Sequence, residues 1–432
     1  MRFVKFILKH NTSTEKSEMK REFANAREED ITSISSWRFI IVLIVAVVIF
    51  ISLESTKNSN KSITSMPAKK TEIKNPQYQI STGQIPNFPF KLPNSFVIHI
   101  FASGLGNPRV LTFSPGGTLL VSVPSSNQVI ALPDKDRNGV ADSEKIVVSG
   151  ENHVHGLSFY KGKLFIADVD RVVRYNWNEE NLQATFDKVL FNLPENNDHN
   201  NRTIAFDKQG NMYISVGSTC NVCHENDHRS ATVMISNENG DNPRIFATGL
   251  RNAAFTAINP LTNELWGTEM GRDYLGDDIP PDEINIIKQN NNYGWPNCYG
   301  NKIPDLSFNP NANCSNTIAP IYGIPAHSAP LGLVFINSQE FPRGFQNDLL
   351  VAYHGSWNRT TPTGYKVVHL TVKDNSITSS QDFLTGFLPS DVLNGPNNAY
   401  GRPVDLVFDT FGNLYISDDK AGNIYIIQKN LN

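Results

Sequence analysis

The sequence lacks an excess of positive charge. Its 38 Lys and Arg residues are outnumbered by 42 Asp and Glu residues, which leaves a formal net charge of −4 over 432 residues. A nucleic-acid-binding protein needs a basic face, so this composition argues against nucleic acid as a partner. Hydrophobic residues make up 39% of the chain and aromatic residues 10%, which indicates a packed core. We therefore expect one large closed domain with an appended segment.

Long apolar runs are scarce, and Phe39–Leu53 is the conspicuous one. A run of about 15 to 17 residues is near the lower limit for a membrane span. A cleaved signal peptide is the alternative, but its charged leader would be much shorter than the 36 residues before Trp37. The predicted organisation is a cytoplasmic segment at 1–36, a transmembrane signal anchor at 37–53, a flexible linker at 54–93 and the folded domain at 94–432.

Charge does not orient this anchor, because Lys and Arg residues are nearly balanced on its two sides. The four cysteines supply the missing indication, since all lie in polar loops, as disulfides in an oxidising compartment do. The natural pairing joins Cys220 to Cys223 and Cys298 to Cys314, although four cysteines allow three pairings. Structural zinc is a less favoured alternative, because the two spacings match no zinc ribbon. We expect the domain on the extracytoplasmic side.

Helical periodicity is missing around Cys220–His224, whose sequence CNVCH matches the attachment pattern of c-type haem. A cytochrome domain needs several helices and an axial ligand. We therefore favour a loop disulfide over a haem site.

A short phrase occurs six times: an apolar strand, a turn with Gly or Asn, and a second strand opening with Leu or an aromatic residue. The copies are Val110–Val123, Gly156–Ala167, Thr203–Val216, Phe255–Glu269, Gly332–Tyr353 and Val404–Ser417. Repetition at this spacing is typical of small sheets stacked radially. Each sheet buries both faces only against its neighbours, so the sequence predicts an all-β, six-bladed β-propeller behind an N-terminal transmembrane anchor helix. Each blade would deliver one loop to an axial pocket.

The segment Asp134–Glu144 has the oxygen spacing of a calcium-binding loop. Its candidate ligands are Asp134, Asp136, Asn138 and Asp142. Oxygen ligands at positions one, three, five and nine, with Gly at six, match an EF-hand loop. Position twelve is Lys145 and no helices flank the segment, so we predict a calcium loop between blades. A polar turn without metal is the alternative.

The predicted axial loops are rich in His and Arg. His199 lies near Arg202 in one of them, and an imidazole with an ordinary pKa of roughly 6.5 can act as a general base at neutral pH. Arginines in other loops, converging on one funnel, would need an anionic ligand such as a planar polycarboxylate. These loops contain Arg251 with Asn252, Arg359 and Arg402. Candidate apolar walls are Trp295, Trp357 and Tyr400, for which packing between blades is the alternative role.

Four elements, taken in chain order, resemble those of the soluble quinoprotein glucose/sorbosone dehydrogenases. They are His199, FATGLRN, DEINIIKQNNNYGWP and a Tyr/Arg element before the last blade. The elements AHSAPLG, HGSWNR, GYKVV and GRPV resemble the sorbosone dehydrogenase branch most closely. The resemblance covers about residues 95–428. It implies a six-bladed propeller that binds pyrroloquinoline quinone (PQQ) and calcium and oxidises sugars, aldoses or related polyols and aldehydes.

The resemblance also assigns roles to residues. His199 matches the catalytic base, Arg251 and Asn252 match quinone contacts, and Arg402 matches one of two late cofactor arginines. Tyr400 stands where the other would be, and the family's cofactor lysine is missing, with Arg359 and His354 as replacements. The candidate cofactor-binding residues are Arg202, Arg251, Asn252, His327, His354, Trp357, Arg359, Tyr400 and Arg402. Gly271 and Arg272 match carbonyls that hold calcium at the quinone, and Glu283 and Tyr293 match a structural calcium site.

These observations predict a membrane-anchored, outward-facing, PQQ- and calcium-dependent dehydrogenase that passes electrons to an external acceptor. Calcium and Arg251 would polarise the quinone, His199 would remove the substrate hydroxyl proton, and hydride would pass to the quinone. A calcium-dependent lactonase would instead need several carboxylates converging on an axial metal, where these loops contain His and Arg. A non-catalytic binding propeller is the remaining alternative.

Overall fold

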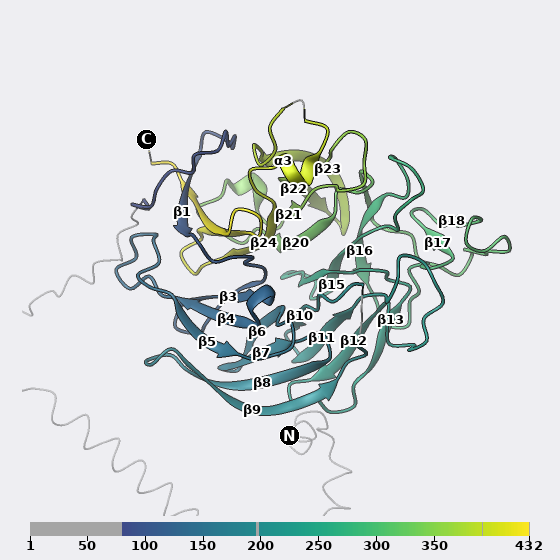
Figure 1. Ribbon diagram of the computed structural model, residues 1–432, viewed down its shortest axis with the longest axis horizontal. Coiled ribbons are helices and arrows are strands. Elements are labelled where there is room, and N and C mark those ends of the chain that lie inside the picture. The colour runs from purple at the N-terminus through teal and green to yellow at the C-terminus, as the bar shows by residue number, and fades with distance from the viewer. Residues whose placement is uncertain (1–79, 196–197, 391, 432) are drawn as a thin grey trace, which may run out of the picture. The chain divides into compact units, whose positions relative to one another are not determined.

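The computed structural model describes residues 80–195, 198–390 and 392–431, which form six four-stranded antiparallel sheets around a central axis (Figure 1). The first three blades, from the axis outward, are β2 (Leu111–Phe113), β3 (Leu119–Val123), β4 (Gln128–Leu132) and β5 (Lys145–Ser149); β6 (Gly156–Tyr160), β7 (Lys163–Ala167), β8 (Arg171–Asn178) and β9 (Gln183–Asn192); and β10 (Ile204–Phe206), β11 (Asn211–Val216), β12 (Thr232–Asn237) and β13 (Arg244–Thr248). The predicted six-bladed propeller is confirmed.

The other three blades are built the same way. They are β14 (Phe255–Ile258), β15 (Leu265–Glu269), β16 (Asp282–Ile287) and β19 (Tyr322–Ile324); β20 (Pro330–Phe335), β21 (Leu349–Tyr353), β22 (Lys366–Lys373) and β23 (Ser376–Leu384); and β24 (Pro403–Phe408), β25 (Leu414–Asp418), β26 (Asn423–Lys429) and β1 (Phe96–Ala102). A hairpin of β17 (Cys298–Tyr299) and β18 (Ile303–Pro304) is inserted in the fourth blade. The short helices are η1 (Pro124–Ser126), η2 (Arg343–Phe345) and α3 (Gly395–Asn398).

The ring is closed by strands from opposite ends of the domain, because β1 pairs antiparallel with β26. Residues before β1 also pack on this blade and on the segment that follows β23 of the fifth: Ser81 N donates to Gln428 Oε1 at 2.6 Å, Lys91 bridges to Thr385, and Phe90 contacts Phe387. The packed chain therefore begins earlier than the boundary at 93/94 predicted from composition. Polar residues of the linker belong to the fold because they hydrogen-bond to strand edges there.

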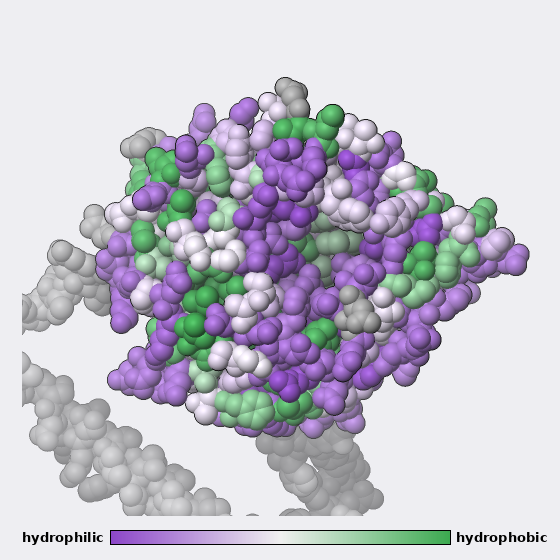
Figure 2. All heavy atoms as spheres, in the orientation of Figure 1, coloured by the Kyte–Doolittle hydropathy of each residue, from purple (hydrophilic) through white to green (hydrophobic). Residues whose placement is uncertain are grey.

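The predicted anchor at 37–53 lies outside the described residues. Within the described ranges, no helix is long and apolar enough to cross a membrane. Polar side chains dominate the face of the propeller shown in Figure 2, with apolar residues in scattered patches.

The repeated phrase corresponds to the hairpin between the first and second strand of a blade. In the third blade the Asp207 carboxylate accepts hydrogen bonds from the backbone amides of Gln209 and Asn211, and Gly210 follows at a φ of +84°. The sixth blade repeats this turn with Asp409 and Gly412. Such Asx turns need a residue that tolerates positive φ, which explains why the glycine recurs in the repeat.

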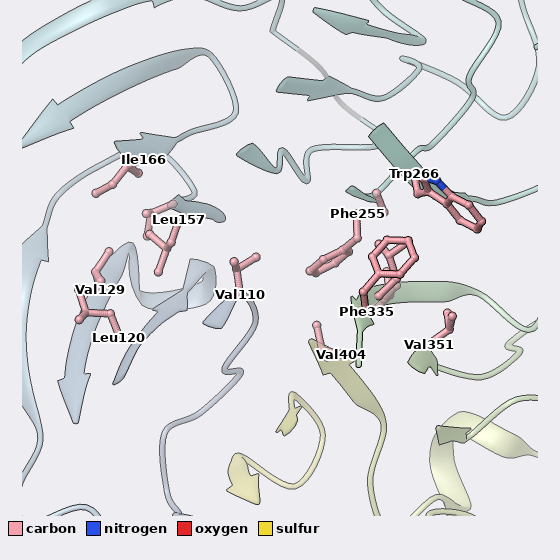
Figure 3. Close-up of a cluster of buried hydrophobic side chains, with 14 of the residues drawn as sticks. Val110, Leu120, Val129, Leu157, Ile166, Phe255, Trp266, Phe335, Val351 and Val404 are labelled. Carbon is pink, nitrogen blue, oxygen red and sulfur yellow. The ribbon is translucent and has the colours of Figure 1, made fainter. Parts of the chain in front are cut away.

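Apolar residues of the innermost strands meet near the axis, where Val110, Phe255 and Val404 come from three different blades (Figure 3). Between the fourth and fifth blades, Trp266 packs edge-to-face on Phe335 with ring centroids 5.2 Å apart. Burying each such side chain contributes roughly 1.5–3 kcal/mol. A cavity of about 150 Å³ with residues from all six innermost strands in its wall marks the axial channel.

A buried carboxyl pair joins the first two blades and predicts a pH-dependent stability. Burial and the neighbouring Glu151 raise the pKa of Asp168 from 3.8 to about 8, while Arg171 and Tyr175 hydrogen-bond to Glu151. Asp168 is thus protonated in the folded state. Its stabilising contribution is complete below the unfolded-state pKa near 3.8 and is lost as pH rises through about 8.

Asp168→Asn keeps the shape of the protonated acid and cannot ionise. We expect the free energy of unfolding of the variant minus that of wild type to increase by about 1–3 kcal/mol between pH 5 and pH 9, because only wild type loses stability as Asp168 ionises. Urea unfolding of both proteins at the two pH values measures this difference. Parallel pH curves for the two proteins would contradict the assignment.

Candidate active site

Six loops that precede the innermost strands each carry an Arg or a His within four residues of the strand. These residues are Arg109, His155, Arg202, Arg251, His327 and Arg402. The innermost strands run in the same direction, so the loops lie at one end of the axis. Neighbouring loops touch: Arg109 Nε lies 3.5 Å from His155 Nε2, and His155 Nδ1 donates to the Arg202 carbonyl at 2.8 Å. Cationic and imidazole groups therefore ring this opening.

A cavity of about 190 Å³ has two of these residues, Arg251 and His327, in its wall. Its wall includes His199, Arg251, Asn252, Met270, Gly271, Asp273, Asp282, His327, Ala329, Trp357 and Asn358. Six of the residues predicted from the sequence are thus brought together: His199, Arg251, Asn252, Gly271, His327 and Trp357. They come from the third, fourth and fifth blades, which are consecutive around the axis.

His199 is positioned as a base. Its Nδ1 lies 3.0 Å from the Ser218 carbonyl and 2.9 Å from Ser218 Oγ, whose own hydrogen is donated to the Cys220 carbonyl. Nδ1 must then carry the proton, which leaves the lone pair on Nε2. Burial, followed by the charge of Arg251, lowers the pKa of His199 to about 3. The imidazole is therefore neutral at physiological pH.

Arg251 is the most heavily bonded side chain of the cavity. Its guanidinium donates to the carbonyls of Met270 and Gly271, to the carbonyl and side-chain oxygens of Asn221, and to Asp273 at 2.9 Å. All five N–H groups thus have protein acceptors. The single charge of the guanidinium is formally balanced by Asp273, and the guanidinium lies in the cavity wall beside His199.

A second cluster lies between the fifth, sixth and first blades. The Asp419 carboxylate accepts from Arg109 at 2.6 Å and from His354 Nε2 at 2.9 Å, and Arg402 donates to the carbonyls of His354 and Gly355. Burial lowers the pKa of His354 to about 4, against the opposing effect of Asp419. Predicted cofactor residues His354 and Arg402 therefore contact each other across two blades, outside the wall of the cavity.

Three further predicted cofactor residues, besides His354 and Arg402, do not line the cavity. Arg202 is fully buried, and its guanidinium donates to the carbonyls of Pro194, His199 and Asn201, so it supports the His199 loop. Arg359 bonds to the Asp277 and Ala326 carbonyls and to Asp278, which ties two loops together. Tyr400 is 42% exposed and stacks on Phe88. Trp295 donates to the Asn221 carbonyl at 3.3 Å.

The four residues that match calcium ligands share one small cavity of about 30 Å³. Gly271, Arg272, Glu283 and Tyr293 all lie in its wall, together with Glu269. Glu269 pairs with Glu283 across β15 and β16, and its Oε2 is buried with no hydrogen-bond partner. Burial raises the pKa of Glu269 well above its ordinary value and that of Glu283 to about 7. A cavity of this size holds one water or ion.

The Asp134–Glu144 loop keeps its predicted shape, but its carboxylates are occupied by the loop backbone. Asp134 accepts from the amides of Asn138 and Gly139, and Asp142 accepts from that of Lys135. Among the described residues, the one set of three His, Cys, Asp or Glu ligand atoms within 4.8 Å is Cys220, Cys223 and Glu225. Calcium binding by this loop stays a prediction.

The disulfide pairing is confirmed: Cys220 is bonded to Cys223 and Cys298 to Cys314. The first bridge closes the loop that carries Asn221, a residue that the sequence did not single out. Three more residues that contact the predicted ones from other blades were not identified from the sequence: Asp273, Glu269 and Asp419. Their one local signal is position, since Glu269 and Asp419 lie at or just beyond the end of a blade's second strand.

Comparison with known proteins places the chain in a family. A family model described as TrAA12-like matches residues 90–430. An uncharacterised protein of Borreliella burgdorferi is 31% identical over 352 residues, covering 78% of this chain and 89% of the relative. A "Pyrroloquinoline quinone-dependent pyranose dehydrogenase" of Coprinopsis cinerea is 25% identical over 80% of this chain, but the match covers 55% of that longer protein.

A solved "calcium structure" of Trichoderma reesei Carbohydrate-Active Enzymes Family AA12 shares the fold, with a TM-score of 0.70 at 23% identity. The alignment covers 81% of this chain and all of that one. The predicted resemblance to quinoprotein sugar dehydrogenases is confirmed at the level of the family, and its sorbosone branch stays a prediction. Because the family model spans nearly the whole propeller, the chain belongs to the TrAA12-like family.

Proposed function

We propose that this protein is an oxidoreductase that uses PQQ and calcium to oxidise a sugar at the axial cavity. The observation that carries the proposal is a cavity whose wall brings His199 together with Arg251 and His327, two of the six axial Arg and His residues. Arginine in such a wall, with further arginines in the neighbouring axial loops, favours an anion, and PQQ is a planar tricarboxylate. The name of the Coprinopsis cinerea relative points to the same cofactor and to pyranose sugars.

When bound, PQQ supplies the electron-accepting carbonyl that takes hydride from the sugar. The chain's own residues would prepare the site for it. Arg251 contributes positive charge, and Asn252 is fixed in the wall because its backbone amide donates to Glu269 at 3.0 Å. His199 Nε2 would accept the hydroxyl proton of the substrate. An anion beside Arg251 would offset the charge that lowers the His199 pKa, making the imidazole a stronger base when the site is loaded.

The mouth of the cavity suits a sugar ring. Trp357, which lines the cavity, is 57% exposed, and Tyr274 beside it is 77% exposed. Their rings meet edge-to-face with centroids 6.1 Å apart. Exposed aromatic faces next to a polar cavity offer apolar contact to the C–H face of a pyranose, while Asp273 and Asn358 in the same wall can bond to its hydroxyl groups.

The small cavity beside this site fits a calcium ion. Calcium prefers several oxygen ligands, and Glu269 Oε2, which has no hydrogen-bond partner, would be one of them. Gly271, Arg272 and Glu283 in the same wall would supply others, although the Glu283 oxygens also accept from Asn285 and Gly300. A cation would also remove the cost of ionising two buried carboxyl groups whose pKa values burial raises. Bound calcium would contribute positive charge that polarises an oxygen of the cofactor.

The two disulfides support an extracytoplasmic location, and we propose that the segment at 37–53 anchors the propeller to the membrane. An external electron acceptor would then complete each turnover.

Titration of the full-length protein with PQQ in the presence of CaCl₂ tests the proposed function. We expect saturable binding at one PQQ per chain, followed by absorbance changes when aldoses are added. Glu269→Gln should lose most of the calcium dependence of PQQ binding, whereas Asp136→Asn, in the Asp134–Glu144 loop, should retain it. Absence of PQQ binding by wild type would refute the dehydrogenase and favour a binding propeller.

A further inference from the structure

The loop between β11 and β12 is closed at its base and joined to both His199 and Arg251. The Cys220–Cys223 disulfide closes it, and the Glu225 carboxylate accepts from Thr219 N and Oγ1, each at 2.7 Å. Ser218, at the start of the loop, contacts His199 through its carbonyl and hydroxyl oxygens, and its amide donates to the Arg251 carbonyl at 2.7 Å. The loop is thus a fixed part of the cavity's support.

Asn221 lies inside this disulfide-closed loop and contacts both members of the Arg251–Asp273 ion pair. Its carbonyl oxygen accepts from Arg251 Nε at 2.9 Å, and its Oδ1 accepts from Arg251 Nη2 at 2.9 Å. The same Oδ1 accepts from the Asp273 amide at 2.8 Å, and Nδ2 donates to the Asp273 carbonyl at 3.3 Å. One residue therefore holds an edge of the guanidinium and the backbone of its carboxylate partner.

The residue that holds the guanidinium edge is neutral, and this matters for ligand binding. Two parallel N–H···O bonds fix the plane of an arginine as a carboxylate would. Asp273 already balances the charge of Arg251, so a second carboxylate here would make the group net negative and would repel an anion. The backbone carbonyl and the side-chain oxygen of Asn221 supply the two acceptors without a negative charge.

We propose that Asn221 is a positioning residue that fixes the guanidinium of Arg251 without adding a second negative charge to the Arg251–Asp273 pair beside the anionic ligand of the cavity. The Cys220–Cys223 bridge holds Asn221 in place for this role. The identity of the anion rests on the proposed function, but the hold on Arg251 does not.

The first test measures how firmly Asn221 fixes the Arg251 guanidinium in the ligand-free protein. Phenylglyoxal modifies guanidinium groups, and peptide mass mapping gives the modification rate of Arg251, which is buried at 4% exposure in the full chain. Asn221→Ala removes one acceptor of the guanidinium and should accelerate modification about tenfold. Asn221→Asp retains the acceptor and should stay within about twofold of wild type. The matched control is Asn211→Ala, at the opposite end of β11, where the side chain bonds to Asp207.

The second test measures charge, with PQQ and CaCl₂ as the probe. Asn221→Ala and Asn221→Asp should each raise the dissociation constant of PQQ about tenfold or more, the first by loosening Arg251 and the second by adding a negative charge to the Arg251–Asp273 pair. Asn211→Ala should leave it unchanged. Thermal unfolding reports whether each variant folds. If Asn221→Ala does not fold, weaker PQQ binding with slow Arg251 modification in Asn221→Asp supports the proposal, and unchanged binding overturns it.

The two measurements separate this inference from the proposed function. If wild type binds no PQQ, the proposed cofactor is wrong, and the phenylglyoxal rates still decide whether Asn221 holds Arg251. An unchanged rate in Asn221→Ala, or an equal acceleration in Asn211→Ala, overturns the positioning role.

Discussion

Replacing His199 with alanine is expected to lower the turnover of the PQQ- and calcium-loaded protein by ~10²–10⁴-fold, with PQQ affinity changed by less than about threefold. The imidazole is held through Nδ1 by Ser218, so the variant removes the Nε2 lone pair and little else from the cavity wall. The arginines and the candidate calcium ligands, which would attract the cofactor, are untouched. Stopped-flow reduction with an aldose at saturating PQQ measures the effect.

His228→Ala is the matched control, because His228 is an exposed histidine in the loop that follows β11. It should retain wild-type turnover. The pKa of His199, about 3 in the ligand-free protein, also predicts that the imidazole of the unloaded protein is neutral throughout the range from pH 5 to 8. Near wild-type turnover in His199→Ala would show that the base is another residue, with His327 and His354 the next to test.

Replacing Arg251 with alanine is expected to raise the dissociation constant of PQQ by on the order of 10²-fold and to lower the free energy of unfolding by about 2–4 kcal/mol. The Arg251 side chain is 5% exposed and that of Asp273 is 17% exposed, so the variant leaves a largely buried carboxylate without its charge partner. It also leaves acceptors at Asn221 and Gly271 unpaired. PQQ titration and urea unfolding measure the two effects separately.

The double variant Arg251→Ala/Asp273→Asn distinguishes loss of charge from loss of packing. Removing the stranded carboxylate should recover part of the stability, while PQQ affinity should stay low because the cation is still missing. Arg229→Ala is the control, since Arg229 pairs with Asp227 at 2.6 Å in the same blade but outside the cavity. Unchanged PQQ affinity in Arg251→Ala would place the anion elsewhere, for example at Arg109 and Arg402.

The fold was accessible from the sequence because each blade is a local structure. The turn that holds Asp207 and Gly210 recurs with Asp409 and Gly412, and each copy forms from residues within about ten positions of one another. Strand pairing inside a blade follows chain order, so the hydrophobic pattern and turn residues suffice to predict it. The disulfide pairing followed for the same reason, since each pair is close in sequence.

Contacts between blades were not accessible in this way. Arg202 and Arg251 look alike in the sequence, as each precedes an innermost strand. In the structure, Arg202 is buried among carbonyls of its own loop, while Arg251 enters the cavity and meets Asn221 and Asp273 from other loops. Pairing of β1 with β26 likewise joins residues more than 300 positions apart. No local sequence pattern predicts such a contact.

By itself, the sequence determined the number of blades and the presence of His199 and several arginines in axial loops, because these depend on short-range patterns, and it favoured one disulfide pairing among three. Only the tertiary structure decided which of those side chains share a cavity, that Glu269 meets Glu283 beside Gly271, and that Asn221 holds Arg251. Ring closure is the physical reason. The burial, charge and hydrogen-bond partners of an axial side chain are set by loops from neighbouring blades, which come together only when the propeller closes.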